Sequence, residues 1–383
     1  MMGVVLTAVS AALILLILLD AFETVVLPRR VTRPYRFARL YYRESWIVWR
    51  AAARRIKAGK RRETFLSIFG PLSILLLFGS WAVGLIVAFG LLQWSLGTPL
   101  RSPEGEVVAL GTYVYFSGVT FFTLGLGDVT PLGPLGRSLA VIESGLGFGF
   151  IALMISYLPV LYQAFSRREV PISLLDARAG SPPSAAQLLL RLAQARRIRD
   201  VDPFLVEWER WSGEVLESHL SFPLLSYYRS QHDNQSWLAA LTTVLDTCTL
   251  IIGGVKDADP YQAQLTFAMA RHAVVDLALV FQTAPVPLDH DRLSAAELAR
   301  LRQLLREEGL LLREGPVFDE KIAQLREMYE PFVNALAQYF VLALPTIVPE
   351  KTGVDNWQTS AWTKRTVSFG GLPVTDDKTD HFV

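Results

Sequence analysis

The feature that most constrains the fold is three long stretches of sequence without a charged residue. They cover residues 1–19, 64–100 and 144–166 of a 383-residue chain. A helix needs about 20 mostly apolar residues to cross the hydrocarbon core of a bilayer, so each stretch is long enough to span it. From Arg167 onward the chain has the charge density of a globular protein. The sequence therefore predicts a membrane-spanning half followed by a domain outside the bilayer.

The first stretch fits either a retained membrane helix at about residues 4–27 or a cleaved signal peptide. The retained helix is favoured because the segment lacks a basic n-region, and no A-x-A-like cleavage site precedes the first charged residues.

Arginine and lysine are concentrated between the first two apolar stretches. Residues 29–62 hold thirteen of them and a single acid, Glu44. Because the cytoplasmic loops of membrane proteins carry an excess of basic residues, this segment is expected in the cytoplasm of a cell-membrane protein. The N-terminus then lies outside. Spans at about 65–96 and 135–165 return the chain to the cytoplasm and leave loop 97–134 external.

Apolar residues recur at helical spacing within this basic segment. They are Phe37, Leu40, Tyr41, Ile47, Val48 and Ala51. Arginines fill much of the rest, which favours an amphipathic helix in contact with membrane lipid. The alternative is a charge block that only sets topology. Nucleic-acid binding is disfavoured because both flanks are membrane helices.

The external loop contains an apolar segment that is too short to span a bilayer. Residues 111–122 read G-T-Y-V-Y-F-S-G-V-T-F-F, and T-L-G-L-G-D follows at 123–128. Non-helical backbone at membrane depth is tolerated only where protein buries it or where it lines a water-filled cavity. Alternating glycines allow successive carbonyls to point the same way, and a ring of carbonyls can replace a cation's hydration shell. The pattern predicts a re-entrant helix and an ion-binding loop; a plain glycine-rich turn is the alternative.

This region resembles the pore domain of the potassium channel superfamily. The resemblance is carried by Y-F-S-G-V-T-F-F-T-L-G-L-G-D-V-T-P at 115–131, by G-R at 136–137 and by a central glycine in the next helix. The family filter reads T-V-G-Y-G-D. The positions that match it are Thr123, Gly125, Gly127 and Asp128. Leu124 stands where the family usually has Val or Ile. Leu126 stands where it has Tyr or Phe, as leucine also does in some second pores of two-pore-domain potassium channels.

The resemblance implies a role for each filter residue. The ion-binding residues would be Thr123, Leu124, Gly125, Leu126 and Gly127, through backbone carbonyls and the Thr123 hydroxyl. Asp128 would brace the filter at the outer mouth. A ring needs four copies and the chain has one filter, so a homotetramer with its axis along the pore is expected. Leu126 lacks the hydroxyl that helps to hold the family filter, so weaker discrimination between K⁺ and Na⁺ is expected.

Two residues of the third span, Gly147 and Pro159, have roles implied by the same resemblance. Gly147 occupies the position of the gating hinge, although close helix packing explains it equally well. Pro159, twelve residues further on, would bend the helix near the gate. Glu143 lies one turn before Gly147. It either supports the filter by bracing the pore helix or lines the cavity, and bracing is favoured.

Two further carboxylates, Asp20 and Glu23, lie near the cytoplasmic end of the first span. Intramembrane carboxylates normally face protein or water. Pairing with Arg29 and Arg30 is favoured over a sensing role. The first span has no arginines spaced through it, so no voltage sensor is predicted.

The segment from 167 to 184 is interpreted as a linker, 185–349 as a helical cytoplasmic domain and 350–383 as a tail. Helical periodicity predicts helices at about 185–199, 203–220, 235–253, 260–283, 293–309 and 318–343. Ser184 and Ser294 are expected N-caps. No alternating strand pattern and no G-x-G-x-x-G turn is present, which argues against a nucleotide-binding regulatory domain.

Several features of this domain have two interpretations. The apolar segments 237–255 and 265–281 are long enough to span a bilayer, but the charges within them favour buried core helices. His272 and Asp276 fit either a metal site or a polar pair. The polar stretch 226–237 fits either a site for an unknown cytoplasmic ligand or a loop that caps the next helix. The single cysteine, Cys248, excludes an intrachain disulfide and is expected to be buried.

Together these features predict an all-α membrane protein with a tetrameric, potassium-channel-like pore. Each chain would supply three spanning helices, a re-entrant pore helix and an all-α cytoplasmic domain. Residues 1–28 form the extra N-terminal helix, 29–63 the basic interfacial segment and 64–166 the pore domain. The predicted function is passive conduction of a cation, K⁺, with no enzymatic chemistry and no cofactor besides the permeant ion. The alternatives are a weakly selective monovalent cation channel, an ion-coupled transporter subunit and a membrane-anchored signalling protein with a non-conducting pore.

Overall fold

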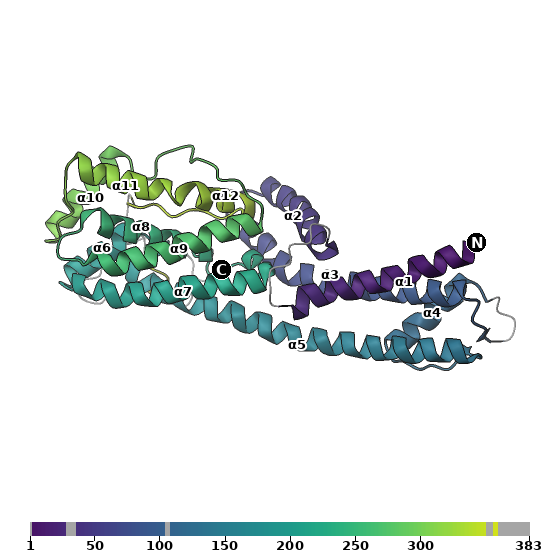
Figure 1. Ribbon diagram of the computed structural model, residues 1–383. Helices are drawn as coiled ribbons and strands as arrows, with labels where there is room; N and C mark the ends of the chain where they lie inside the picture. Colours follow the sequence, from purple (N-terminus) through teal and green to yellow (C-terminus); the bar gives the residue numbers. More distant parts are fainter. Residues whose placement is uncertain (1, 28–35, 104–107, 350–354, 359–383) are drawn as a thin grey trace. The chain divides into compact units, whose positions relative to one another are not determined.

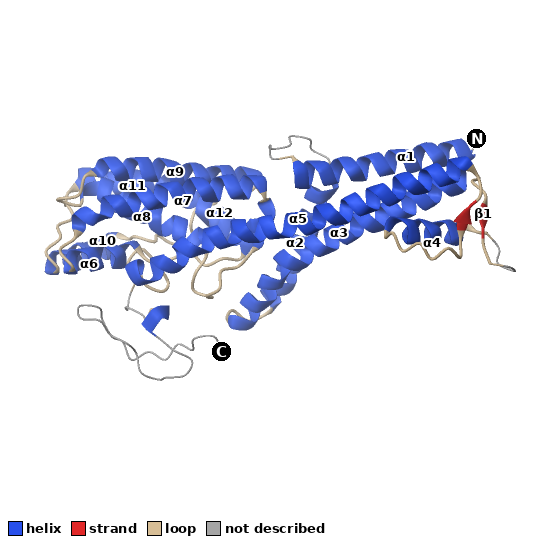
Figure 2. Cartoon of the chain, turned by 90° about the horizontal axis from the view of Figure 1, so that it is seen from below, coloured by secondary structure: helices blue, strands red, loops and turns tan. Residues whose placement is uncertain are grey.

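The computed structural model describes residues 2–27, 36–103, 108–349 and 355–358. The chain is an all-α membrane protein, as predicted, and only two strands of two residues each occur in the described part (Figures 1 and 2). It divides into two compact units: Met1–Ile56 with Ser67–Gln163, and Lys57–Leu66 with Ala164–Val383. The long helices α3 (Lys60–Ser95) and α5 (Pro134–Ala179) contribute residues to both units.

The first unit contains the predicted membrane spans. Helix α1 (Met2–Ala21) continues into the π-helical turn η1 (Phe22–Val26). Helices α1 with η1, α3 and α5 are each long and apolar enough to cross a bilayer, which confirms three predicted spans. Helix α4 (Leu110–Phe121) has only 12 residues, and its bounds lie within one residue of the predicted re-entrant segment at 111–122. The interfacial segment forms helix α2 (Phe37–Arg55).

Asp20 joins the first three helices. Its Oδ2 accepts hydrogen bonds from the backbone N–H of Ala38 at 3.0 Å and from the Trp81 Nε1–H at 3.1 Å. Ala38 lies in the first turn of α2, so a carboxylate from α1 satisfies one of the free donors of that helix start. Glu23 pairs with Arg36 at 3.3 Å. The predicted partners Arg29 and Arg30 lie outside the described residues.

The second unit is a bundle of helices (Figure 1). Its elements are α6 (Ala185–Gln194), η2 (Ile198–Asp200), α7 (Val201–Ser221), η3 (Pro223–Tyr227), α8 (Trp237–Gly254), α9 (Pro260–Val280), α10 (Ala295–Glu307), α11 (Pro316–Glu327), α12 (Glu330–Phe340) and η4 (Asn356–Gln358). Every residue of α8 from Trp237 to Gly253 is buried, including Cys248. Helices α7, α9, α11 and α12 pack around α8. Helices α8 and α9 also have the length and composition of membrane spans. The burial of α8 within the bundle is the arrangement expected of a core helix.

The expected N-caps are confirmed and two boundaries differ from the prediction. Ser184 accepts from Gln187 N at 3.2 Å, and Ser294 forms a capping box with Glu297. The segment interpreted as a linker from residue 167 is helical as far as Ala179, where Gly180, with φ of 88°, ends α5. The charges at 167 and 168 mark the end of the apolar run and not the end of the helix, because Arg168 is buried and bonded within the bundle.

The helix predicted at 318–343 is two helices. Helix α11 ends at Glu327 and α12 begins at Glu330, with Pro331 in its first turn. Proline lacks the N–H that would continue the ladder and is well suited to a helix start. The break also lets Tyr329 turn inward, where its hydroxyl donates to Asp246 of α8.

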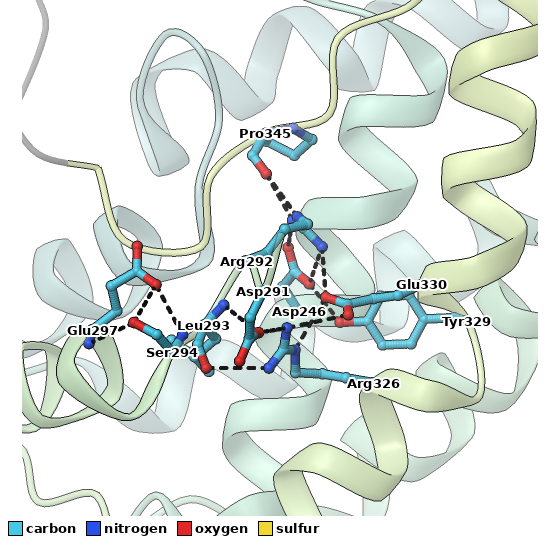
Figure 3. A network of polar contacts seen from close by, with 10 residues as sticks. All are labelled: Asp246, Asp291, Arg292, Leu293, Ser294, Glu297, Arg326, Tyr329, Glu330 and Pro345. Atoms are coloured by element: carbon cyan, nitrogen blue, oxygen red, sulfur yellow. Dashed lines mark hydrogen bonds and ion pairs between the residues drawn. The ribbon is translucent and has the colours of Figure 1, made fainter. Parts of the chain in front are cut away.

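A buried polar network holds this break against α8 (Figure 3). Arg292 donates to Asp246 Oδ2 at 2.6 Å and to Glu330 Oε1 at 3.1 Å. Glu330 also accepts from Arg326 Nε at 3.0 Å. These carboxylates hold the pKa of Arg292 above its ordinary value although burial opposes it. Because each charge has its partners, removing one of them would leave an uncompensated buried charge.

Candidate functional site

The loop that follows α4 has a backbone of alternating handedness. Thr123, Gly125 and Gly127 have φ of 55°, 63° and 81°, while Leu124 and Leu126 between them are not in the positive-φ region. Residues of alternating hand turn successive peptide units so that their N–H groups point to one side and their carbonyls to the other. A row of carbonyls on one side is what coordination of a bare cation requires.

The two glycines of this loop are needed for their backbone conformation and not for space. A Cβ built at Gly125 or Gly127 would have no neighbour within 4 Å. Positive φ is nevertheless strained for residues with a side chain, and strongly so for a β-branched one such as Thr123. Leu124 and Leu126 are each 62% exposed in the single chain. The leucines thus offer an apolar surface on the loop that the chain itself does not cover.

Helix α4 ends directly at this loop. The N–H of Thr123 donates to Thr120 O at 3.0 Å and the N–H of Leu124 to Val119 O at 2.9 Å, which fixes the loop to the last turn of the helix. The C-terminal end of a helix carries a partial negative charge of about half an elementary charge. Thr123 therefore lies where the helix dipole favours a cation.

Asp128 is braced by a residue that the sequence interpretation missed. The Tyr115 hydroxyl of α4 donates to Asp128 Oδ2 at 2.7 Å, and Val129 N donates to Oδ1 at 3.0 Å. The hydrogen bond from Tyr115 lowers the pKa of Asp128. The signal was an aromatic hydroxyl 13 residues before the acid. The contact ties the end of the glycine loop back to the helix that begins it.

A small apolar cluster anchors the other side of the loop. Strand β1 (Leu100–Arg101) pairs antiparallel with β2 (Thr130–Pro131), and β1 is red in Figure 2. Val129 packs with Leu100, Tyr113 and Phe116. The Tyr113 hydroxyl donates to Thr98 O at 2.7 Å, so both arms of the external loop are held to α4.

Glu143 is fully buried between three helices. Its Oε1 accepts from Ser117 of α4, and its Oε2 accepts from Gln93 Nε2 of α3 at 3.4 Å. The Ser117 hydroxyl also lies 2.7 Å from Ile86 O. Glu143 therefore makes the contacts of a residue that braces the pore helix, the favoured alternative in the sequence interpretation.

Gly147 lies against the end of α4. A Cβ at this position would overlap the Phe121 carbonyl oxygen and would lie 2.8 Å from its carbon. Neighbouring Gly145 and Gly149 have nothing within 4 Å of such an atom. Close packing thus accounts for this glycine. Helix α5 continues through both Gly147 and Pro159.

Two other candidate sites show contacts that suit the simpler of their two interpretations. The His272 Nε2 and Asp276 Oδ2 atoms are 3.6 Å apart, and no group of three metal-binding side chains occurs among the described residues. In the polar stretch, Ser236 caps α8 by accepting from Ala239 N at 3.0 Å, and Arg229 bonds elsewhere in the bundle. These contacts fit the polar pair and the capping loop.

A polar junction in the second unit receives the ends of α3 and α5. Arg168 donates to Leu225 O at 2.7 Å and to Tyr228 O at 2.9 Å. Arg229 lies 3.5 Å from Glu63 in the first turn of α3 and donates to Phe340 O at 2.6 Å. No sequence pattern marked this junction, because Arg168 directly follows an apolar run and resembles the ordinary basic flank of a membrane span.

Comparison with known proteins assigns a class to part of the chain. Residues 73–163 match the sequence model of a family described as "Ion channel". This match supports a channel pore domain over α4, the glycine loop and the adjoining parts of α3 and α5, and it points to a non-enzymatic channel.

A curated relative is also a membrane protein. The chain is 24% identical over 241 residues to an uncharacterized membrane protein, YdjJ, of Bacillus subtilis (strain 168), covering 62% of this chain and 69% of the relative. Together with the apolar helices, this likeness supports a multi-pass membrane protein. No solved structure gives a significant match.

Proposed function

We propose that the chain forms a potassium-selective channel, a homotetramer with the residue 123–127 carbonyls around its axis. The observation that carries the proposal is the alternation of positive φ at Thr123, Gly125 and Gly127 at the end of a 12-residue helix. This backbone suits a row of ion-binding carbonyls in a cell membrane, with the N-terminus outside and the helical domain in the cytoplasm.

The tetramer is supported by the apolar side chains that a single chain leaves exposed around the glycine loop. Each chain holds one filter segment, and its Phe122, Leu124 and Leu126 side chains are exposed in the described structure. Single-chain exposure of several large apolar groups around a glycine loop favours burial against other copies. Four-fold closure would bring four rows of carbonyls around one axis.

Gating is proposed to involve the inner helix and the helical domain. Helix α5 runs from the filter region past Gly147 and Pro159 to Arg168, which is buried in the domain. A rearrangement of the domain would therefore act on the same continuous helix that packs against the end of α4.

The test is ion flux through the full chain in liposomes. The wild type should pass K⁺ in preference to Na⁺, and Gly125→Asp should abolish flux because aspartate is strained at φ of 63° and places a charged side chain beside the ion sites. Gly309→Asp is the matched control, since Gly309 has φ of 80° and open space around it in the helical domain.

Each outcome of this test has a defined meaning. Absence of wild-type flux would contradict conduction and favour a signalling protein with a non-conducting pore. Equal K⁺ and Na⁺ flux would contradict potassium selectivity and favour the weakly selective channel. A purified particle of fewer than four copies, measured by mass photometry, would contradict the tetramer.

A further inference from the structure

Helix α2 presents three different faces, and one of them packs against α3 in the described part of the first unit. On the packed face Ala38, Trp46 and Ala53 are buried, and the ring of Trp46 lies 4.8 Å from that of Phe69 in α3. The Tyr41 hydroxyl donates to Ser73 O at 3.0 Å. These contacts fix how the helix is rotated and therefore which residues point away from α3.

The second face of α2 is apolar and exposed. Its residues are Phe37, Leu40, Ile47 and Val48, of which Val48 is 71% exposed. Their spacings of three, seven and one place them on one side of a helix with 3.6 residues per turn. A row of large exposed apolar side chains of this kind marks a surface that contacts protein or membrane lipid.

The third face is a row of arginines beside the apolar one. Arg39, Arg43, Arg50 and Arg54 are separated by four, seven and four residues, so they form one stripe along the helix. Arg39, Arg43 and Arg54 are exposed, and Arg50 is half-buried. The acid of this helix, Glu44, pairs with Arg43 at 2.7 Å and offsets part of the charge. The stripe remains strongly basic.

We propose that α2 binds anionic phospholipid, with the arginine stripe on headgroup phosphates and the apolar face among the acyl chains. Guanidinium groups suit phosphate because their donors form a planar fork, and basic residues near an anionic leaflet each strengthen binding. A protein partner would have to match both faces, whereas a lipid surface supplies phosphate and hydrocarbon side by side. The inference rests on the membrane orientation in the proposed function but not on conduction.

Contacts at the start of α2 connect this lipid site to two spans. Asp20 of α1 accepts from Ala38 in α2 and from Trp81 in α3. Lipid bound along α2 therefore sets the position of a helix whose first turn is bonded to Asp20 of α1, and the same carboxylate is bonded to α3. Opening of the pore is expected to depend on the anionic lipid content, through this contact.

The test measures where Val48 lies and needs no ion flux. The native Cys248 is buried, so a Val48→Cys substitution gives a site that labels selectively with an environment-sensitive fluorophore. The labelled full chain is reconstituted in phosphatidylcholine vesicles with increasing phosphatidylglycerol. Brominated lipid should quench the label, and quenching should increase with phosphatidylglycerol. The R39Q/R43Q/R54Q variant should lose this increase, and the R39K/R43K/R54K variant should retain most of it.

Controls separate lipid binding from other causes. The R196Q/R197Q/R199Q variant removes the same charge from an exposed segment of the helical domain and should quench as the parent does. The proposal would be overturned if quenching changed neither with the phosphatidylglycerol content nor with substitution of the arginines. A label shielded from brominated lipid and from aqueous iodide would also overturn the proposal, because it would show protein, such as a second copy, on this face. Normal quenching without flux would contradict the channel and leave the lipid site standing.

Discussion

At the scale of single residues, Thr123 concentrates the backbone strain of the loop. A β-branched residue at φ of 55° is disfavoured by about 1–3 kcal/mol and persists only when its surroundings enforce it. Here the N–H groups of Thr123 and Leu124 are both held by carbonyls of the last turn of α4. The strain is placed where a hydroxyl and a carbonyl of one residue can both face an ion.

Tyr115 is predicted to support selectivity by holding Asp128. Tyr115→Phe removes the 2.7 Å hydrogen bond and keeps the ring, so the loop loses one tie to α4. Because Leu126 cannot supply a tie of its own, the K⁺ to Na⁺ permeability ratio should fall while flux persists. The ratio is measured from reversal potentials in bilayers. The pKa of Asp128 should rise toward its ordinary value, since the hydrogen bond that lowers it is gone.

A matched change distinguishes this tie from the aromatic surface of α4. Tyr113→Phe removes a hydroxyl that donates to Thr98 O, on the other arm of the loop. It should leave the ratio closer to that of the wild type. An unchanged K⁺ to Na⁺ permeability ratio in Tyr115→Phe would show that the Tyr115 hydroxyl does not support selectivity.

The sequence predicts the residues of the loop better than the residues that support it. Gly125 and Gly127 follow from a local rule, because left-handed backbone favours glycine, whereas Thr123 was predicted from the resemblance to the family motif. Tyr115 and the role of Asp20 do not follow, since each depends on a partner from another element. A hydroxyl among aromatic residues and a carboxylate at a span end have many compatible partners until the helices are packed.

At the scale of elements, the approach of α5 to α4 depends on one glycine. Gly147→Ala would force the methyl group into the Phe121 carbonyl, so α4 or α5 must shift. Overpacking of this kind typically destabilises by about 1–3 kcal/mol. Gly149→Ala meets nothing within 4 Å and should be neutral or slightly stabilising, because alanine favours a helix interior over glycine by about 0.5–1 kcal/mol.

Thermal unfolding in detergent measures the effect of each substitution on stability, and flux in liposomes measures its effect on conduction. We expect Gly147→Ala to lower both the unfolding temperature and the flux, and Gly149→Ala to lower neither. A Gly147→Ala protein of full stability with altered open probability would argue for the hinge and against packing.

Element boundaries were predictable where a local signal marks them. Ser184 and Ser294 start their helices as expected, and Pro331 and Gly180 act as start and stop signals once the flanking packing is known. The extension of α5 beyond residue 167 was not predictable from hydropathy. Charge ends the apolar run there, but the helix continues because the bundle supplies acceptors for a buried arginine.

At the scale of the whole molecule, two helices belong to both compact units. The first turns of helix α3, which include Glu63, belong to the second unit, and the rest of the helix belongs to the first. Helix α5 begins in the first unit and ends in the second. Glu63 faces Arg229, whose pKa burial lowers although Glu63 raises it. Burial thus has a larger effect on the pKa of Arg229 than the attraction of Glu63, and removing either partner would leave a largely buried charge without this counter-charge.

A double-mutant cycle on Glu63 and Arg229 tests whether this contact couples the helical domain to the pore. Each single change, Glu63→Gln or Arg229→Gln, removes this ion pair and leaves the other group charged, while Arg62 remains 3.9 Å from Glu63 in the Arg229→Gln variant. The double variant should therefore be more stable than the sum of the single effects predicts. The interaction energy expected for contacting residues is about 0.5–3 kcal/mol, read from unfolding in detergent. If α3 transmits the state of the domain, open probability should show the same non-additivity.

The exposed pair Arg306 and Glu314 provides the control cycle, because both side chains are more than half exposed. Surface pairs contribute about 0–1 kcal/mol, so Arg306→Gln and Glu314→Gln should combine almost additively and leave gating unchanged. Non-additive stability at Glu63 and Arg229 with additive gating would make the contact purely structural. The proposed action of the domain on the pore would then be tested next at Arg168 of α5.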